Sequence, residues 1–169
     1  RPYTSVTTRD HTVDGAEITP RARTLPGRIG TFGHGYTGGA HPLGAAVALE
    51  NLAIIKERDL VANARVVGEH FLGRLRTLAD RPLVGEVRGV GLISALELVN
   101  DKTAKSVSTT GKLGGLMSAA MQRGGMISRN MTDTVAFCPP MIITRAQADD
   151  MFEIVAKALG EVEAEVAST

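Results

Sequence analysis

The sequence predicts a domain of the α+β class, in which helices cover a small sheet. Apolar residues recur at spacings of three and four over residues 60–79 and again over residues 148–166, which indicates two amphipathic helices. Between them, short apolar runs bounded by glycine or proline at residues 84–99 and 126–137 are typical of strands. A chain of 169 residues is long enough to form one compact domain around its own core.

The composition disfavours several classes of partner. The formal net charge is +1, which provides no strong field to attract nucleic acid or an anionic membrane. No apolar stretch approaches the roughly 20 residues needed to span a bilayer. Cys138 is the only cysteine, so a disulfide within the chain is impossible, and we expect a reducing, cytoplasmic compartment.

Residues 1–28 differ from the rest of the chain. They are rich in Thr, Arg and Pro, and their apolar residues follow no period, so we expect this segment to be irregular or disordered. Two origins stay open: a natural flexible leader, or DNA read out of frame or from a wrong start. Order is expected to begin at Ile29.

The first two expected helices follow a glycine-rich segment, residues 31–40. Pro42 lies in the first turn of one helix, where its missing N–H costs nothing. Residues 43–52 of that helix are apolar nearly all round, which predicts a buried helix. The second helix covers about residues 60–79, carries one apolar stripe and ends before Pro82.

The remaining elements are predicted from short apolar runs and their boundaries. We expect strands over residues 84–87 and 90–99, a helix over 113–122, strands over 126–129 and 135–137, and a last helix. Gly124 and Gly125 are suited to end the middle helix. Thr144 and Gln147 form a capping box, which begins the last helix.

The glycine-rich segment contains the spacing G-x-G-x-x-G at Gly33, Gly35 and Gly38. A dinucleotide-binding loop would need a strand before it and an acidic residue on the next strand. The preceding segment is instead polar, and Asp59 lies near a helix end, which disfavours that interpretation. Glycine backbone beside a helix N-terminus suits an anion, and the Thr37 hydroxyl would add a donor. From the pattern alone, a tight turn without a ligand stays open.

Three stretches resemble the class III pyridoxal-phosphate-dependent aminotransferases, in the family's order. Residues 30–42, with His34-Gly35-Tyr36-Thr37 and His41-Pro42, are similar to the family's H-G-[FY]-T-x-S-G-H-P segment. Residues 88–92, Arg-Gly-Val-Gly-Leu, resemble its R-G-x-G-L motif, and residues 127–144 resemble its final sheet segment, as found in omega-transaminases. The resemblance covers about residues 29–166.

The resemblance implies part of a fold type I transferase, an α/β family fold of which this chain would be a truncated portion. It divides the chain into residues 1–28, unmatched to the family; residues 29–80, the glycine loop and long interdomain helices; and residues 81–169, the small C-terminal α+β domain. It implies a homodimeric enzyme with pyridoxal 5'-phosphate, which moves an amino group from an amine or amino acid to a keto acid such as pyruvate.

The resemblance also implies roles for individual residues. Thr37, with Tyr36, would bind the cofactor phosphate of the neighbouring subunit. Arg129 would bind the substrate carboxylate, because a guanidinium can grip a carboxylate through two parallel hydrogen bonds. Without the resemblance, the favoured interpretation of Arg129 is a surface arginine beside a turn. We expect Arg88 to be structural and to pair locally.

Other reactive side chains are not expected to take part in chemistry. His34 and His41 are seven residues apart, which is not the spacing of metal ligands, so we expect them to order the loop. Cys138 ends an apolar run before two prolines and is expected to be buried and inert.

A Schiff-base lysine is needed for transamination with pyridoxal phosphate, and it needs a desolvated pocket. The sequence has lysines only in polar surroundings: Lys56, Lys102, Lys105, Lys112 and Lys157. In the family this lysine precedes the glycine loop, a region that residues 1–28 do not resemble. We therefore expect no catalytic residue here and no activity of this chain alone. A non-catalytic interaction module and an unrelated phosphate-binding α+β domain stay open as alternatives.

Overall fold

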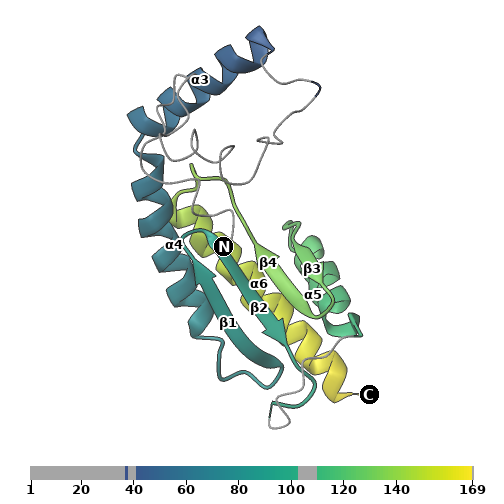
Figure 1. Ribbon diagram of the computed structural model, residues 1–169. Coiled ribbons are helices and arrows are strands. Elements are labelled where there is room, and N and C mark those ends of the chain that lie inside the picture. Colours follow the sequence, from purple (N-terminus) through teal and green to yellow (C-terminus); the bar gives the residue numbers. More distant parts are fainter. Residues whose placement is uncertain (1–36, 38–40, 103–109, 169) are drawn as a thin grey trace, which may run out of the picture. The chain divides into compact units, whose positions relative to one another are not determined.

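The computed structural model describes residue 37, residues 41–102 and residues 110–168 (Figure 1). The expectations for residues 1–36, including most of the glycine loop, lie outside the described residues. The helices are α3 (Pro42–Glu57), α4 (Leu60–Arg76), α5 (Lys112–Arg123) and α6 (Arg145–Ala167); the strands are β1 (Val84–Val90), β2 (Ile93–Leu98), β3 (Arg129–Met131) and β4 (Thr134–Phe137). The chain forms two compact units, Arg1–Arg58 and Asp59–Thr169.

The second unit is built on a four-stranded sheet with the order β1-β2-β4-β3. Each pair of neighbouring strands is antiparallel. Helices α4, α6 and α5 cover one face of this sheet, with α6 packed against both of the others (Figure 1). This arrangement confirms the predicted α+β class. The division at residues 80 and 81 stays a prediction for the complete fold; in this chain α4 packs with the sheet.

The core lies between the sheet and the helices. The stripe predicted on α4 is buried there, and the Phe71 ring meets the Phe137 ring of β4 edge to face, with centroids 5.7 Å apart. On α6 the predicted stripe is also buried, with Val155, Leu159 and Val162 inaccessible or nearly so. The period of 3.6 residues therefore identified the buried faces correctly.

In the Arg-Gly-Val-Gly-Leu stretch, Arg88, Gly89 and Val90 end β1, and Gly91 and Leu92 form the turn to β2. The first strand is therefore longer than the predicted residues 84–87, and Val90 ends it instead of beginning the second strand. Gly91 has a positive φ of 54°, which a residue with a side chain rarely adopts. The turn lies directly on α4: a Cβ atom added to Gly68 would come within 2.1 Å of the Gly91 carbonyl carbon. The two glycines thus allow backbone-to-backbone contact between the helix and the hairpin.

Of two predicted element boundaries, the start of α6 is confirmed and the start of β3 was wrong. The capping box is present: the Gln147 N–H donates to the Thr144 hydroxyl at 3.2 Å, and the Thr144 N–H donates to the Gln147 side chain at 3.0 Å. The strand expected at residues 126–129 lies instead at Arg129–Met131. Its predicted start is taken up by the end of α5, where Gly125 has a φ of 90° and the Met126 N–H bonds the Met121 carbonyl at 3.0 Å.

Helix α3 belongs to the first unit and differs from the expectation of a buried helix. Pro42 occupies its first turn, as predicted, but none of the helix's residues is buried. Leu43 is 68% exposed and Val47 is 60% exposed. An apolar helix is buried only where another surface covers it, and the described residues supply no such cover. None of the described helices combines the length and the apolar character required to cross a membrane.

Candidate carboxylate-binding site

Two arginines stand at opposite ends of one row across the sheet. Arg88 of β1 pairs with Ala95 of β2, Ala95 pairs with Ala136 of β4, and Ala136 pairs with Arg129 of β3. Paired residues of antiparallel strands place their side chains on the same face. We call these four residues the arginine row. Its face is the one opposite the helices, because the alternate residues, such as Leu96 and Val135, are buried in the core.

Arg88, at one end of the row, is neutralised by two carboxylates. Its Nη1 donates to Glu86 Oε2 and to Glu97 Oε2, each at 2.8 Å. The hydrogen bond to Glu97 is the main cause that raises the pKa of Arg88, although partial desolvation opposes it. Glu97 lies on the adjacent strand β2, and its side chain is only 16% exposed. The expected local, structural pairing of Arg88 is therefore confirmed.

Arg129, at the other end, is exposed and begins the edge strand β3. Among the described residues, no carboxylate forms an ion pair with it. Exposed apolar side chains lie two residues away on either side: Ile127 is 88% exposed and Met131 is 49% exposed. A cation with apolar neighbours and an alanine floor suits a ligand that carries a carboxylate on an apolar body.

The hairpin that carries Arg129 is fastened to α5 by Asp133, whose role the sequence analysis missed. The Asp133 side chain is 0% exposed. Its Oδ1 accepts the Gly114 N–H at 2.7 Å and its Oδ2 accepts the Gly111 N–H at 3.1 Å. The sequence did offer one signal: Gly111 stands at the N-terminus of α5 and has no side chain that could cap the helix, so a cap from elsewhere in the chain is needed.

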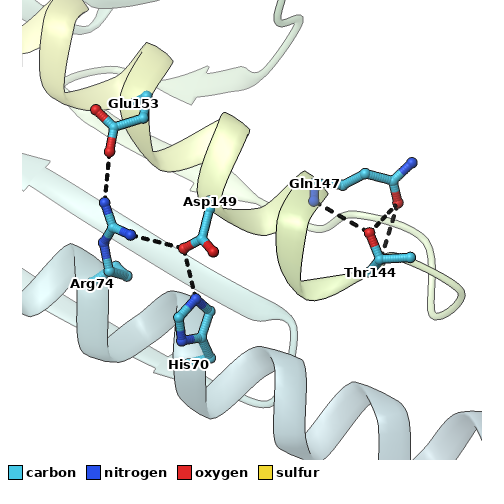
Figure 2. A network of polar contacts seen from close by, with 6 residues as sticks. All are labelled: His70, Arg74, Thr144, Gln147, Asp149 and Glu153. Carbon is cyan, nitrogen blue, oxygen red and sulfur yellow. Dashed lines mark hydrogen bonds and ion pairs between the residues drawn. The ribbon is translucent and has the colours of Figure 1, made fainter.

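A second polar network, also missed, joins α4 to α6 on the helical side of the domain (Figure 2). His70 Nε2 lies 2.7 Å from Asp149 Oδ1, and Arg74 donates to the same oxygen at 2.8 Å and to Glu153 at 2.6 Å. The Arg74 guanidinium also lies 4.1 Å from the centroid of the Phe152 ring. The hydrogen bond from His70 is the largest cause that lowers the pKa of Asp149. We interpret this network as structural.

The residues predicted at the glycine loop are only partly described. Thr37 is exposed in a turn of the first unit, whereas Tyr36 and His34 lie outside the described residues. His41 precedes α3 and makes no capping bond with its side chain. Thr37 and Arg129 belong to different units, and each is described by itself. The role of Thr37 and Tyr36 stays a prediction.

Two further expectations concern single side chains. Cys138 is exposed, so the expectation that it is buried was wrong. The reason is strand alternation: Phe137 points into the core, and the next residue therefore points outward. Lys56, Lys102, Lys112 and Lys157 are all exposed, and Lys105 lies outside the described residues. Within the described ranges, no group of three or more potential metal ligands comes together.

The arrangement of helices and sheet is that of transaminases. The structure titled "Transaminase with L-ala" superposes with a TM-score of 0.78 and 52% identity, covering 88% of this chain and 36% of that one. The omega-transaminase of Pseudomonas jessenii in complex with PMP superposes with a TM-score of 0.76 and 43% identity, over 86% of this chain and 32% of that one. The putrescine–pyruvate aminotransferase of Pseudomonas aeruginosa is 39% identical over 138 residues, which are 81% of this chain and 30% of the relative.

The sequence profile described as "Aminotransferase class-III" matches residues 15–159. The chain belongs to the class III aminotransferase family, whose members use pyridoxal 5'-phosphate. The match begins upstream of Ile29, so the segment without family resemblance is shorter than residues 1–28. The chain spans about a third of the length of the relatives it matches.

The described residues fit one end of pyridoxal phosphate. The exposed Thr37 hydroxyl is a suitable donor to a phosphate. The aldehyde end needs a lysine amine in a desolvated pocket. Since the four described lysines are all exposed, none of them fits that end.

Proposed function

We propose that the chain provides the carboxylate-recognising part of a transaminase, which transfers an amino group from an amine or amino acid to a keto acid such as pyruvate. The observation that carries the proposal is the exposed Arg129, which has no carboxylate partner among the described residues. Its planar guanidinium would hold the carboxylate of the keto acid or amino acid through two hydrogen bonds. Support comes from the name of the putrescine–pyruvate aminotransferase, in which the acceptor is a keto acid.

The cofactor contacts follow from the same proposal. Pyridoxal phosphate, when bound, supplies the electron sink that amino-group transfer requires. The hydroxyl of Thr37, with Tyr36, would hold its phosphate in the neighbouring subunit of a homodimer. A hydrogen bond to a charged group contributes about 1.5–3 kcal/mol. Thr37→Ala is therefore expected to weaken cofactor retention without changing which substrates are accepted.

We infer that the Schiff-base lysine is not among the five lysines of this chain, because the four described ones are exposed to water and Lys105 lies in a polar stretch of the sequence. The chain would then contribute binding and orientation, while the proton-transferring group comes from elsewhere in the complete enzyme.

A chimera tests the proposed role of Arg129. Residues 29–169 replace the homologous segment of the 52%-identical transaminase. The first half-reaction is then measured through the cofactor's absorbance with L-alanine, which carries a carboxylate, and with 1-phenylethylamine, which has none. Arg129→Ala is expected to raise the KM for L-alanine roughly ten-fold or more and to spare 1-phenylethylamine.

Arg88→Ala is the matched control, because it removes the same side chain from the other end of the arginine row. It is expected to leave the preference between the two donors unchanged. An Arg129→Ala variant that impairs both donors equally would show that Arg129 is structural and would contradict the proposal.

A further inference from the structure

The β3–β4 hairpin leaves Arg129 on a weakly supported element. Strand β3 has three residues, Arg129–Met131, and pairs only with β4 because it forms the edge of the sheet. An arginine side chain has many rotamers, and an edge strand is bonded on one side only. A carboxylate must nevertheless be met at a defined place, since a displacement of about 1 Å can cost roughly a hundred-fold in rate.

Helix α5 supplies the missing support through Asp133, the second residue of the hairpin turn. The first amides of a helix have no acceptor within the helix. The buried carboxylate of Asp133 accepts two of them, from Gly111 and from Gly114. Its backbone carbonyl accepts the Leu98 N–H of β2 at 2.8 Å. Asp133 therefore joins the hairpin, the sheet and α5, with the favourable end of the helix dipole facing its charge.

A second contact holds the strand next to Arg129 itself. The Ser118 hydroxyl of α5 donates to the Asn130 side chain at 3.1 Å. Adjacent residues of a strand point to opposite faces, so Asn130 faces α5 while Arg129 faces outward. The backbones also touch: a Cβ atom added to Gly114 would lie 2.0 Å from the Thr132 carbonyl oxygen. Helix and hairpin thus form one rigid support beneath the guanidinium.

We propose that Asp133 is a positioning residue for substrate carboxylates, acting through Arg129. Its carboxylate fixes the hairpin on α5, so that the backbone from which the Arg129 side chain extends is held at one place. The inference rests on the proposed function of Arg129 and adds a specificity role for a buried residue on the opposite face of the sheet.

The test uses the same chimera and the same two donors. Asp133→Asn keeps the size of the side chain and removes the second acceptor oxygen. It is expected to raise the KM for L-alanine roughly ten-fold, with kcat/KM for 1-phenylethylamine changed by less than about two-fold. In the double variant with Arg129→Ala, the Asp133 substitution should cause almost no additional loss for L-alanine, because its effect passes through the missing guanidinium.

A pair of glycine variants gives a second measurement, in case Asp133→Asn does not fold. Gly114→Ala would drive a methyl group into the Thr132 carbonyl, whereas a Cβ atom at Gly115 meets nothing within 4 Å. Both substitutions place the same residue in the same helix. Gly114→Ala is expected to reproduce the selective loss for L-alanine, and Gly115→Ala to leave both donors unaffected.

Four outcomes would overturn the inference. Equal losses for both donors, or Asp133 and Arg129 effects that add, would make Asp133 merely stabilising. A discriminating Arg129→Ala beside unaffected Asp133→Asn and Gly114→Ala variants would refute the positioning role and leave the proposed function intact. An Arg129→Ala variant that treats both donors alike would refute the proposed function, and the inference with it.

Discussion

Arg88 and Arg129 occupy equivalent places at the two edges of one sheet, yet their surroundings differ. Both end the arginine row on the face that the helices leave open. Arg88 has two carboxylates at 2.8 Å, one from its own strand and one from the adjacent strand. Arg129 has exposed apolar neighbours, Ile127 and Met131, and no carboxylate among the described residues.

The difference separates an arginine that holds the fold from one that is available to a ligand. The Arg88 guanidinium, whose Nη1 is held by two carboxylates, already has its charge neutralised within the chain. An exposed guanidinium without a partner contributes little to stability, and this is why we propose that Arg129 binds an external carboxylate. Sequence motifs alone marked both arginines; only their partners tell the two roles apart.

The largest expected effect concerns activity without the rest of the enzyme. If Arg129 provides recognition only, the purified 169-residue chain should show no transamination of 1-phenylethylamine with pyruvate, even with added pyridoxal phosphate. Formation of alanine is the measurement. Cofactor-dependent turnover above a protein-free control would break the comparison, because the chain would then hold a complete active site.

A substitution in the arginine row should give Arg129 a carboxylate partner within the chain, as Arg88 has. Ala136→Glu places a carboxylate directly opposite Arg129 on the adjacent strand. In the chimera, the new internal partner should compete with substrate and raise the KM for L-alanine by roughly ten-fold, the equivalent of about 1.4 kcal/mol. Ala136→Gln is the matched control without the charge. Equal KM values for the two variants would mean that bulk, not pairing, causes the effect.

Arg88→Ala should destabilise the fold more than Arg129→Ala does, although Arg129→Ala is expected to have the larger effect on substrate binding. Arg88→Ala removes two ion pairs, and after solvent screening the loss is expected to be about 0.5–1 kcal/mol in the free energy of unfolding. Arg129→Ala should change it by less than about 0.5 kcal/mol. Urea denaturation of the 169-residue chain measures both, and added salt should reduce the Arg88 effect. If Arg129→Ala lowered the free energy of unfolding more than Arg88→Ala, Arg129 would be the structural arginine of the two.

Local patterns were sufficient to predict most elements of the fold. The stripes of α4 and α6, the capping box and the local pairing of Arg88 depend on residues that are close in sequence or share one periodicity. The predicted start of β3 was wrong because the residues that close α5 occupy the same stretch.

Features that depend on distant partners could not be read in this way. Asp133 caps a helix that begins about twenty residues earlier, and His70 pairs with Asp149 across two helices. Gly111 indicates only that α5 needs a cap from elsewhere, and nothing local identifies Asp133 as that cap or Asp149 as the partner of His70. The exposure of Cys138 follows from the last residue of β4, Phe137, which points into the core and leaves the next side chain pointing outward. The availability of Arg129 likewise depends on which carboxylates the folded chain brings near it.

The smallest expected effect extends the comparison to Arg74, another arginine with two carboxylate partners. Folding lowers the pKa of Asp149, chiefly through the hydrogen bond with His70. A carboxyl group whose pKa is lower in the folded state stabilises the fold above its unfolded pKa of about 3.9, and this contribution is lost as the pH falls through the lower folded value.

The wild-type chain should therefore lose stability more steeply than Asp149→Asn on acidification below about pH 5. Asp150→Asn, altered at the next position of α6, serves as the control. Thermal melting between about pH 3 and pH 6 compares the three proteins. Parallel curves for wild type and Asp149→Asn would show that the network contributes no pH-dependent stability, and that an arginine with two partners need not hold a fold together.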